Sequence, residues 1–222
     1  METVLNKIIS DEPIADPISS DKFKNDFNDL SFFGTRDVHN NNKQLLNYYW
    51  FDQGFSKSEC EKIISLAQNN YEQTGGTTFG AGGEYRKSTV RWLPPSSNTE
   101  WIYEKLKWFV KESNEVFSLD ITGFTEYLQF TEYEGAGAKY GYHVDVGPNN
   151  WHRKLSIVVQ LTDPKNYTGG DLNISTGGNV ITPPKDIGNV ILFPSFLQHE
   201  VIPLVSGSRY SLVSWVSGPP WR

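Results

Sequence analysis

The chain has 222 residues, a formal net charge of −6, one Cys and four His. This length suits a single domain of moderate size, and one Cys excludes an intrachain disulfide and a Cys-rich zinc site. There is no Lys/Arg-rich face of the kind that nucleic-acid binding needs, and no apolar run of the roughly 20 residues that a membrane helix needs. We therefore expect neither nucleic acid nor a membrane as a partner, and a cytoplasmic setting because no secretory signal is evident.

Residues 1–47 are weakly patterned and hold much of the acidity. The first 30 residues contain seven acids and three bases, a balance of −4, which leaves −2 for the rest. Such a segment is typical of an arm that is partly ordered and partly mobile. We expect the arm to precede one domain over residues 48–222.

Two helices are predicted next along the chain. Ser56 and Glu59 fit a capping box before a helix over 57–70. Ser97 and Glu100 make a second capping box, and apolar residues then recur at helical spacing over 99–116. Both segments predict amphipathic helices that pack against a core.

The segment between these helices is rich in glycine. Five of the nine residues from Gly75 to Gly83 are Gly, which predicts a flexible loop. A strand over 87–93 follows and ends at Pro94. We expect the segment 75–91 to act as a mobile lid over a substrate.

From about residue 121 the periodicity changes to short β-rich runs punctuated by Gly, Pro, Asn and Asp. This pattern predicts an antiparallel sandwich or jelly roll, with its core over about 120–217 and helices packed on one side. The predicted strands cover 122–133, 154–162, 171–175, 179–182, 189–193, 198–204 and 209–217.

A candidate metal site lies in this β-rich half. His143 and Asp145 are two residues apart, so on extended backbone both side chains face the same way. His199 is the obvious third ligand from another strand. Two His and one carboxylate are typical of non-haem Fe(II) oxygenases, although zinc hydrolases use comparable ligands, so the ligands alone leave the metal open.

Arg209 lies within an apolar strand pattern, where a charge is costly unless it is paired. A planar guanidinium binds carboxylates well. Taken alone, Arg209 fits a structural ion pair with a protein acid as well as it fits a bound ligand. Beside an iron site, a bound dicarboxylate is the better explanation.

Over roughly residues 50–222 the sequence resembles the Fe(II)/2-oxoglutarate-dependent oxygenases, and within them the prolyl 4-hydroxylase-like group. The order and spacing of the matching stretches carry the resemblance. It implies a mostly β double-stranded β-helix, or jelly roll, with flanking helices and the iron inside one open end. The stretches are 128–135, 139–145, 153–161, 169–172, 193–195, 199–201 and 209–215.

The resemblance implies a role for each matching residue. One departure is Gln160, which stands where many prolyl hydroxylases have Tyr beside the co-substrate. The implied metal ligands are His143, Asp145 and His199; the implied co-substrate residues are Arg209, Tyr133, Gln160 and Ser211; and the implied catalytic-pocket residues are Trp215, Tyr140 and Arg153.

The activity implied is hydroxylation of a C–H bond, with decarboxylation of 2-oxoglutarate to succinate and CO2. Fe(II) and 2-oxoglutarate are the implied cofactors, O2 is a co-substrate, and ascorbate is a further candidate. A prolyl residue in a peptide or protein is the first substrate hypothesis. The alternatives are another amino-acid side chain or a small metabolite and, in a different class, a non-catalytic jelly-roll binding module.

Overall fold

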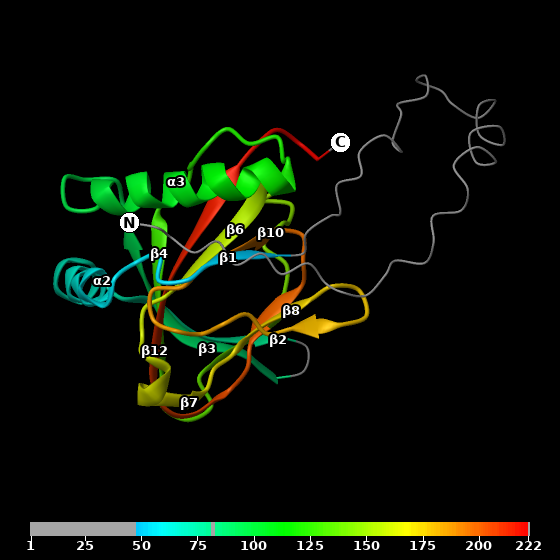
Figure 1. Ribbon diagram of the computed structural model, residues 1–222. Helices are drawn as coiled ribbons and strands as arrows, with labels where there is room; N and C mark the ends of the chain where they lie inside the picture. Colours follow the sequence, from blue (N-terminus) through cyan, green and yellow to red (C-terminus); the bar gives the residue numbers. More distant parts are fainter. Residues whose placement is uncertain (1–47, 81–82, 222) are drawn as a thin grey trace, which may run out of the picture. The chain divides into compact units, whose positions relative to one another are not determined.

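The computed structural model describes residues 48–80 and 83–221 (Figure 1). Two α-helices precede most of the strands, and the regular elements described after α3 are strands apart from a short 3-10 helix at Pro164–Asn166. The elements are β1 (Tyr49–Phe51), α2 (Lys57–Asn70), β2 (Thr74–Gly80), β3 (Gly83–Leu93), α3 (Glu100–Phe117), β4 (Leu128–Glu134), β5 (Lys139–His143), β6 (Arg153–Gln160), β7 (Tyr167–Gly169), β8 (Leu172–Ser175), β9 (Val180–Ile181), β10 (Val190–Pro194), β11 (His199–Val201) and β12 (Leu204–Ser217).

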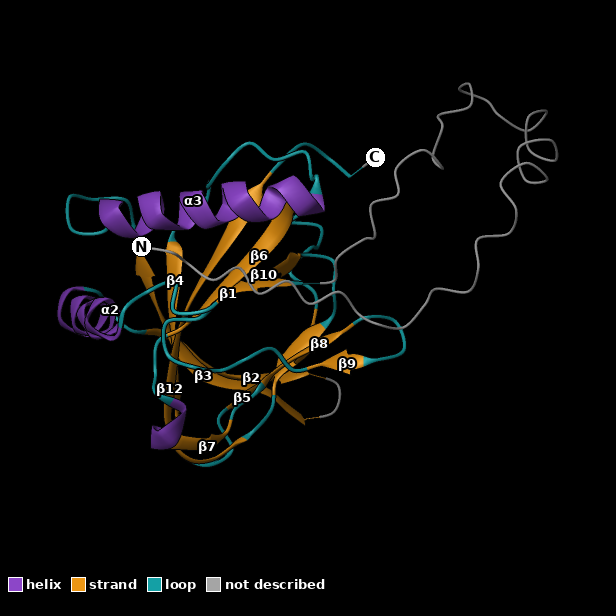
Figure 2. Cartoon of the chain, viewed as in Figure 1, coloured by secondary structure: helices purple, strands orange, loops and turns teal. Residues whose placement is uncertain are grey.

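The strands form one antiparallel sheet that curls on itself. Its order is β1-β10-β6-β12-β4-β3-β5-β11-β8-β9, with β2 added to β3 and β7 added to β12. Figure 2 shows the strands surrounding an interior, with α2 and α3 outside the curled sheet. The predicted jelly roll with flanking helices is confirmed.

Strands β6 and β10 are buried on both faces. Val158, Ile191 and Phe193 point into the core inside the curled sheet. On the outer side α3 packs against β10, and its Phe109 ring lies 4.7 Å from the ring of Phe51 on β1. Burial on both faces suits the apolar run at the start of β10, and each fully buried large side chain contributes about 1.5–3 kcal/mol.

Both predicted helices are present, but only one is capped as expected. The Ser56 hydroxyl accepts from the Glu59 N–H at 3.2 Å, and the Glu59 carboxylate accepts from the Ser56 N–H at 2.7 Å. The second capping box is wrong: Thr99, not Ser97, is the N-cap of α3, without a side-chain cap bond. Its hydroxyl donates instead to the Pro94 carbonyl at 2.7 Å, which fastens the preceding turn.

The predicted glycine-rich loop is also wrong. Strand β2 pairs with β3 as a hairpin, and β3 pairs in turn with β4 and β5. The ladder supplies hydrogen-bond partners that outweigh the low strand propensity of glycine. The segment 75–91 is therefore largely sheet, and our expectation of a free loop there does not hold.

Three short strands, β1, β5 and β7, were not predicted, and β4 begins at Leu128 instead of 122. The predicted arm over residues 1–47 lies outside the described residues, so the domain boundary at residue 48 stays a prediction. Neither α2 nor α3 combines the length and the apolar character needed to cross a lipid bilayer.

Candidate active site

The three predicted metal ligands meet at one end of the curled sheet. His143 is the last residue of β5 and lies directly opposite His199, the first residue of β11. Asp145 lies two residues beyond β5, so our prediction that it shares an extended strand with His143 is wrong. The Asp145 N–H donates to the Ser195 carbonyl at 3.0 Å, and this bond turns the loop toward both imidazoles.

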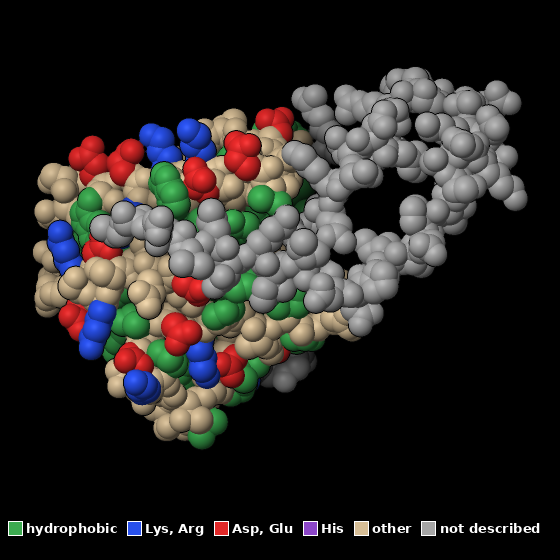
Figure 3. Space-filling model, viewed as in Figure 1, with side chains coloured by type: hydrophobic (Ala, Val, Ile, Leu, Met, Phe, Trp, Pro, Cys, Tyr) green, Lys and Arg blue, Asp and Glu red, His purple; other side chains and the backbone are tan. Residues whose placement is uncertain are grey.

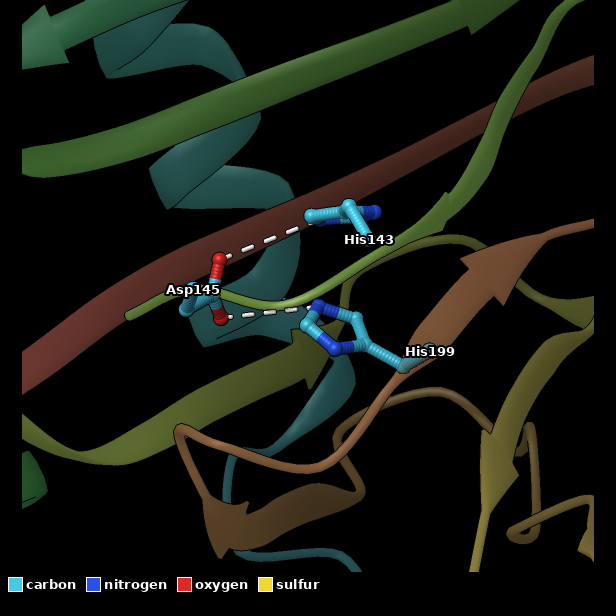
Figure 4. Close-up of side chains that lie close together, drawn as sticks. All are labelled: His143, Asp145 and His199. Atoms are coloured by element: carbon cyan, nitrogen blue, oxygen red, sulfur yellow. Dashed lines mark ion pairs between the residues drawn. The ribbon is translucent and has the colours of Figure 1, made fainter. Parts of the chain in front are cut away.

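The ligand atoms of this cluster point at one another (Figure 4). Nε2 of His143 lies 3.8 Å from one Asp145 oxygen, and Nε2 of His199 lies 3.4 Å from the other. One ligand atom from each residue falls within 4.8 Å of the others. Such a cluster can hold one divalent cation and leave further coordination positions open.

Backbone carbonyls select the tautomer of each imidazole. Nδ1 of His143 contacts the Gly141 carbonyl at 2.9 Å, and Nδ1 of His199 contacts the Leu197 carbonyl at 3.0 Å. A carbonyl oxygen only accepts, so Nδ1 carries the hydrogen in each ring. The Nε2 lone pairs therefore face Asp145 and are available to a metal.

The electrostatics keep His143 and Asp145 in their metal-binding protonation states. Burial, followed by the neighbouring His199, lowers the pKa of His143 to about 4. Burial would raise the pKa of Asp145, but His199, His143 and the Ser156 hydroxyl together hold that pKa below its ordinary value. At neutral pH the cluster therefore offers a neutral imidazole at His143 and a carboxylate at Asp145.

Ser156 fixes the Asp145 carboxylate from behind. Its hydroxyl donates to Asp145 Oδ2 at 2.6 Å and lies 3.0 Å from the Ser195 hydroxyl. Ser156 is fully buried on β6. This hydrogen bond orients one ligand oxygen, in the way that outer partners typically tune metal sites.

Arg153 forms a second support beside the cluster. Its guanidinium pairs with Glu126 through contacts of 2.7 and 2.5 Å and lies over the Trp215 ring, 3.6 Å from its centroid. Its Nη1 also lies 3.9 Å from an Asp145 oxygen. Arg153 is thus held along the wall of the site, and Glu126 is a partner that the sequence did not indicate.

A cavity of about 250 Å³ contains the metal cluster. The predicted residues Tyr133, Tyr140, Arg153, Arg209, Ser211 and Trp215 all line it, whereas Gln160 does not. Tyr140 stacks on His143 with 3.7 Å between ring centroids. Arg86 and Trp92 also line the cavity and were not predicted, because only the pairing of β3 with β4 and β5 brings them there.

Arg209 is a buried cation without an acidic partner. Its side chain is 1% exposed, and Nη2 donates to Gln160 Oε1 at 2.9 Å. Within residues 48–80 and 83–221, Nε and Nη1 have no hydrogen-bond partner and no carboxylate forms an ion pair with the guanidinium. A buried, unpaired charge is costly, so this arrangement favours an anionic ligand over the structural ion pair.

Tyr133 completes this end of the cavity. It lies opposite Arg209 in the pairing of β4 with β12, and the guanidinium carbon is 5.3 Å from its ring centroid. Burial raises the pKa of Tyr133, so its phenol stays protonated and can donate to an anion. The metal cluster, which we call the metal end of the cavity, has ligands that fit Fe(II). Arg209 and Tyr133, which we call the arginine end, fit the distal carboxylate of a ligand such as 2-oxoglutarate.

Comparison with known proteins agrees with this geometry. Residues 128–217 match the profile of the 2OG-Fe(II) oxygenase superfamily. A PKHD-type hydroxylase from Gloeothece citriformis is 37% identical over 92 residues, which cover 40% of this chain and 41% of the relative. This match spans about two fifths of the relative's length, as do the matches to PKHD-type hydroxylases from Synechococcus sp. (strain CC9605) and Alteromonas mediterranea.

Solved structures show the same fold. A prolyl-4-hydroxylase from Pseudomonas putida superposes with a TM-score of 0.62 at 18% identity, covering 78% of this chain and 93% of that one. A prolyl hydroxylase from Trichoplax adhaerens, solved in complex with a hypoxia inducible factor oxygen degradation domain peptide fragment, gives 0.61 at 19% identity, covering 77% and 83%.

The profile match concerns the sequence of the β-rich part of the chain, and the superpositions concern its fold. Residues 128–217 are similar to the 2OG-Fe(II) oxygenase superfamily. Part of the sequence is also similar to PKHD-type hydroxylases, and the fold is similar to that of prolyl hydroxylases.

Proposed function

We propose that this protein is a non-haem Fe(II)/2-oxoglutarate-dependent dioxygenase that hydroxylates a C–H bond, with peptidyl proline as the first substrate. One observation carries the proposal: a single cavity joins the His143–Asp145–His199 cluster to a buried arginine, two of whose nitrogens have no partner in the described part of the chain. A cation site and an anion site in one cavity are what a metal-bound dicarboxylic 2-oxo acid requires.

Each end of the cavity then has a chemical task. His143, Asp145 and His199 would hold Fe(II), while Ser156 keeps the carboxylate oriented. Arg209 and the protonated Tyr133 would bind the distal carboxylate of 2-oxoglutarate. Fe(II) with 2-oxoglutarate and O2 supplies the oxidising power, as 2-oxoglutarate is converted to succinate and CO2.

The remaining walls suit a peptide. The cavity places Tyr140, Trp92 and Trp215 around the metal cluster, and aromatic walls accommodate a proline ring. Arg86 lies over the Tyr140 ring at 4.6 Å, and its buried Nη2 has no partner among the residues with described positions, so it can donate to a peptide carbonyl. The bound peptide of the Trichoplax adhaerens enzyme supports the same substrate class.

The test is a turnover assay with Fe(II), 2-oxoglutarate, O2 and proline-containing peptides, with ascorbate added to keep iron reduced. We expect succinate and a mass gain of one oxygen atom on the peptide. His143→Ala should abolish both, whereas Asn69→Ala on the exposed side of α2 should keep both. Equal turnover by His143→Ala would overturn the metal assignment.

The same assay separates the alternatives. Peptides with Ala in place of Pro, free amino acids and small 2-oxo or hydroxy acids are supplied in parallel. Hydroxylation of these in preference to the prolyl peptides would keep the chemistry and replace the substrate. Absence of near-stoichiometric Fe(II) binding would favour the non-catalytic jelly-roll module.

A further inference from the structure

Gln160 lies outside the lining of the cavity and bonds to Arg209, which is part of that lining. It is the last residue of β6 and shares the inner face of that strand with Ser156 and Val158, because alternate residues point the same way. It is 1% exposed and does not line the cavity. Its Oε1 accepts from Arg209 Nη2 at 2.9 Å, so Gln160 lies behind the guanidinium and touches no ligand itself.

The rest of the Arg209 side chain is held on other sides. Gly170 brings backbone so close that a Cβ there would lie 3.3 Å from Arg209 Cδ. Tyr133 faces the guanidinium from β4. The phenol of Tyr167 also interacts with Arg209. Gln160 orients the guanidinium through Nη2, while Nε and Nη1 have no partner among the described residues.

The neutrality of this partner is the important property. An amide oxygen orients a guanidinium without cancelling its charge, whereas a carboxylate at the same place would form a charge-assisted pair with it. A ligand carboxylate would then compete with an internal one. Arg209 thus keeps its full charge for a ligand only because residue 160 is uncharged.

We propose that Gln160 is a positioning residue that sets the selectivity of this pocket for 2-oxo acids with a second carboxylate. This inference rests on the proposed function, since it takes 2-oxoglutarate as the ligand. It predicts that changes at residue 160 alter recognition of the distal carboxylate and leave recognition of the 2-oxo acid group at the metal unchanged.

The test measures equilibrium binding to Fe(II)-loaded protein without O2, so that no turnover is needed. Two ligands are compared: 2-oxoglutarate, and 2-oxopentanoate, which has a methyl group in place of the distal carboxylate. Gln160→Glu should weaken 2-oxoglutarate binding about 100-fold, the loss expected when a charge-assisted contact is cancelled. Gln160→Leu, which removes the acceptor, should weaken it about tenfold. Binding of 2-oxopentanoate should stay within about twofold of wild type in both.

Gln129→Glu is the matched control, because Gln129 lines the same cavity and bonds to Thr131 instead of Arg209. We expect a smaller loss than at residue 160, and thermal unfolding monitors the folding of every variant. If Gln160→Glu binds 2-oxoglutarate like wild type, or if both ligands weaken equally, the positioning role is wrong. If wild type binds no 2-oxoglutarate, the proposed function itself fails.

Discussion

The two ends of the cavity are built in opposite ways. The metal ligands lie where strands end: His143 closes β5, His199 opens β11, and Asp145 is in a loop. Arg209 and Tyr133 lie within the long strands β12 and β4, each paired along its length. The metal end is assembled from chain turns that hydrogen bonds must hold, whereas the other end is part of the sheet itself.

The charges differ in the same way. At the metal end a carboxylate faces imidazoles and accepts from a serine, so its negative charge is well supported and its pKa is lowered. At the other end, among the residues that the structure describes, the buried guanidinium has a hydrogen bond to a neutral amide and no ion pair. The first end is ready for a cation at little cost, and the second stays destabilised until an anion binds.

Removing the negative charge at the metal end should have the largest effect. Asp145→Asn keeps the shape of the side chain but leaves two imidazoles and an amide. We expect metal affinity to fall by more than the roughly 10–100-fold typical of losing an outer partner, and turnover to vanish. Equilibrium Fe(II) binding without O2 measures the loss, with Asn69→Ala as control. Unchanged affinity would mean that the cluster is not the metal site.

Removing the positive charge at the other end should separate stability from binding. Arg209→Met fills similar space without a charge, so we expect the metal-free, ligand-free protein to gain about 1–3 kcal/mol in free energy of unfolding. The same variant should lose stabilisation by 2-oxoglutarate. Urea unfolding with and without the ligand measures both effects. A loss of several kcal/mol in the ligand-free protein would show that Arg209 has a compensating partner after all.

The two ends also differ in how far the sequence predicted them. The spacing of His143, Asp145 and His199 indicated the metal site, and Arg209 stood out as a charge inside a strand. The position of Asp145 beyond β5 was not predictable, because a hydrogen bond to Ser195, fifty residues away, bends the chain there. The contact between Glu126 and Arg153 was likewise not predictable, because the two residues are distant along the chain.

Fold prediction succeeded where local signals decide and failed where pairing decides. The Ser56 capping box and the apolar spacing of α3 are local, and both helices were found. Four glycines lie within the hairpin of β2 and β3, where sheet pairing outweighs their low strand propensity, and β5 is a short, partly exposed strand without clear alternation. Arg86 reaches the cavity only through this register, opposite Tyr140.

Removing a hydrogen bond to a metal ligand, without changing the ligand itself, should have a moderate effect on Fe(II) affinity. Ser156→Ala removes the donor to Asp145, and we expect about 10–100-fold weaker Fe(II) binding. The affinity of metal-loaded protein for 2-oxoglutarate should change far less, because Arg209 and Gln160 are untouched. Fe(II) titration and 2-oxoglutarate titration of the loaded variant give the two numbers. Equal losses in both would mean that the two ends are not independent.

We expect the smallest effect on 2-oxoglutarate binding from a change at Cys60, a residue of α2 that packs against β6. Its Sγ lies 3.9 Å from the Gln160 carbonyl, and burial, with a contribution from Glu59, raises the pKa of the thiol to about 12. A free thiol ionises near pH 8.5, so the contribution of Cys60 to stability is complete below about pH 8.5 and is lost as the pH rises toward 12.

At pH 8 the folded thiol is therefore neutral and enclosed, and a thiol reagent should label it only through opening of the structure. Cys60→Ala should leave the affinity for 2-oxoglutarate within about twofold of wild type, because no contact of Cys60 reaches Arg209. Saturating 2-oxoglutarate on metal-loaded protein should slow labelling, since it stabilises the closed state in which Cys60 is covered. Rapid labelling of folded protein would mean that α2 does not hold the back of β6, and that Gln160 is less firmly placed than its burial indicates.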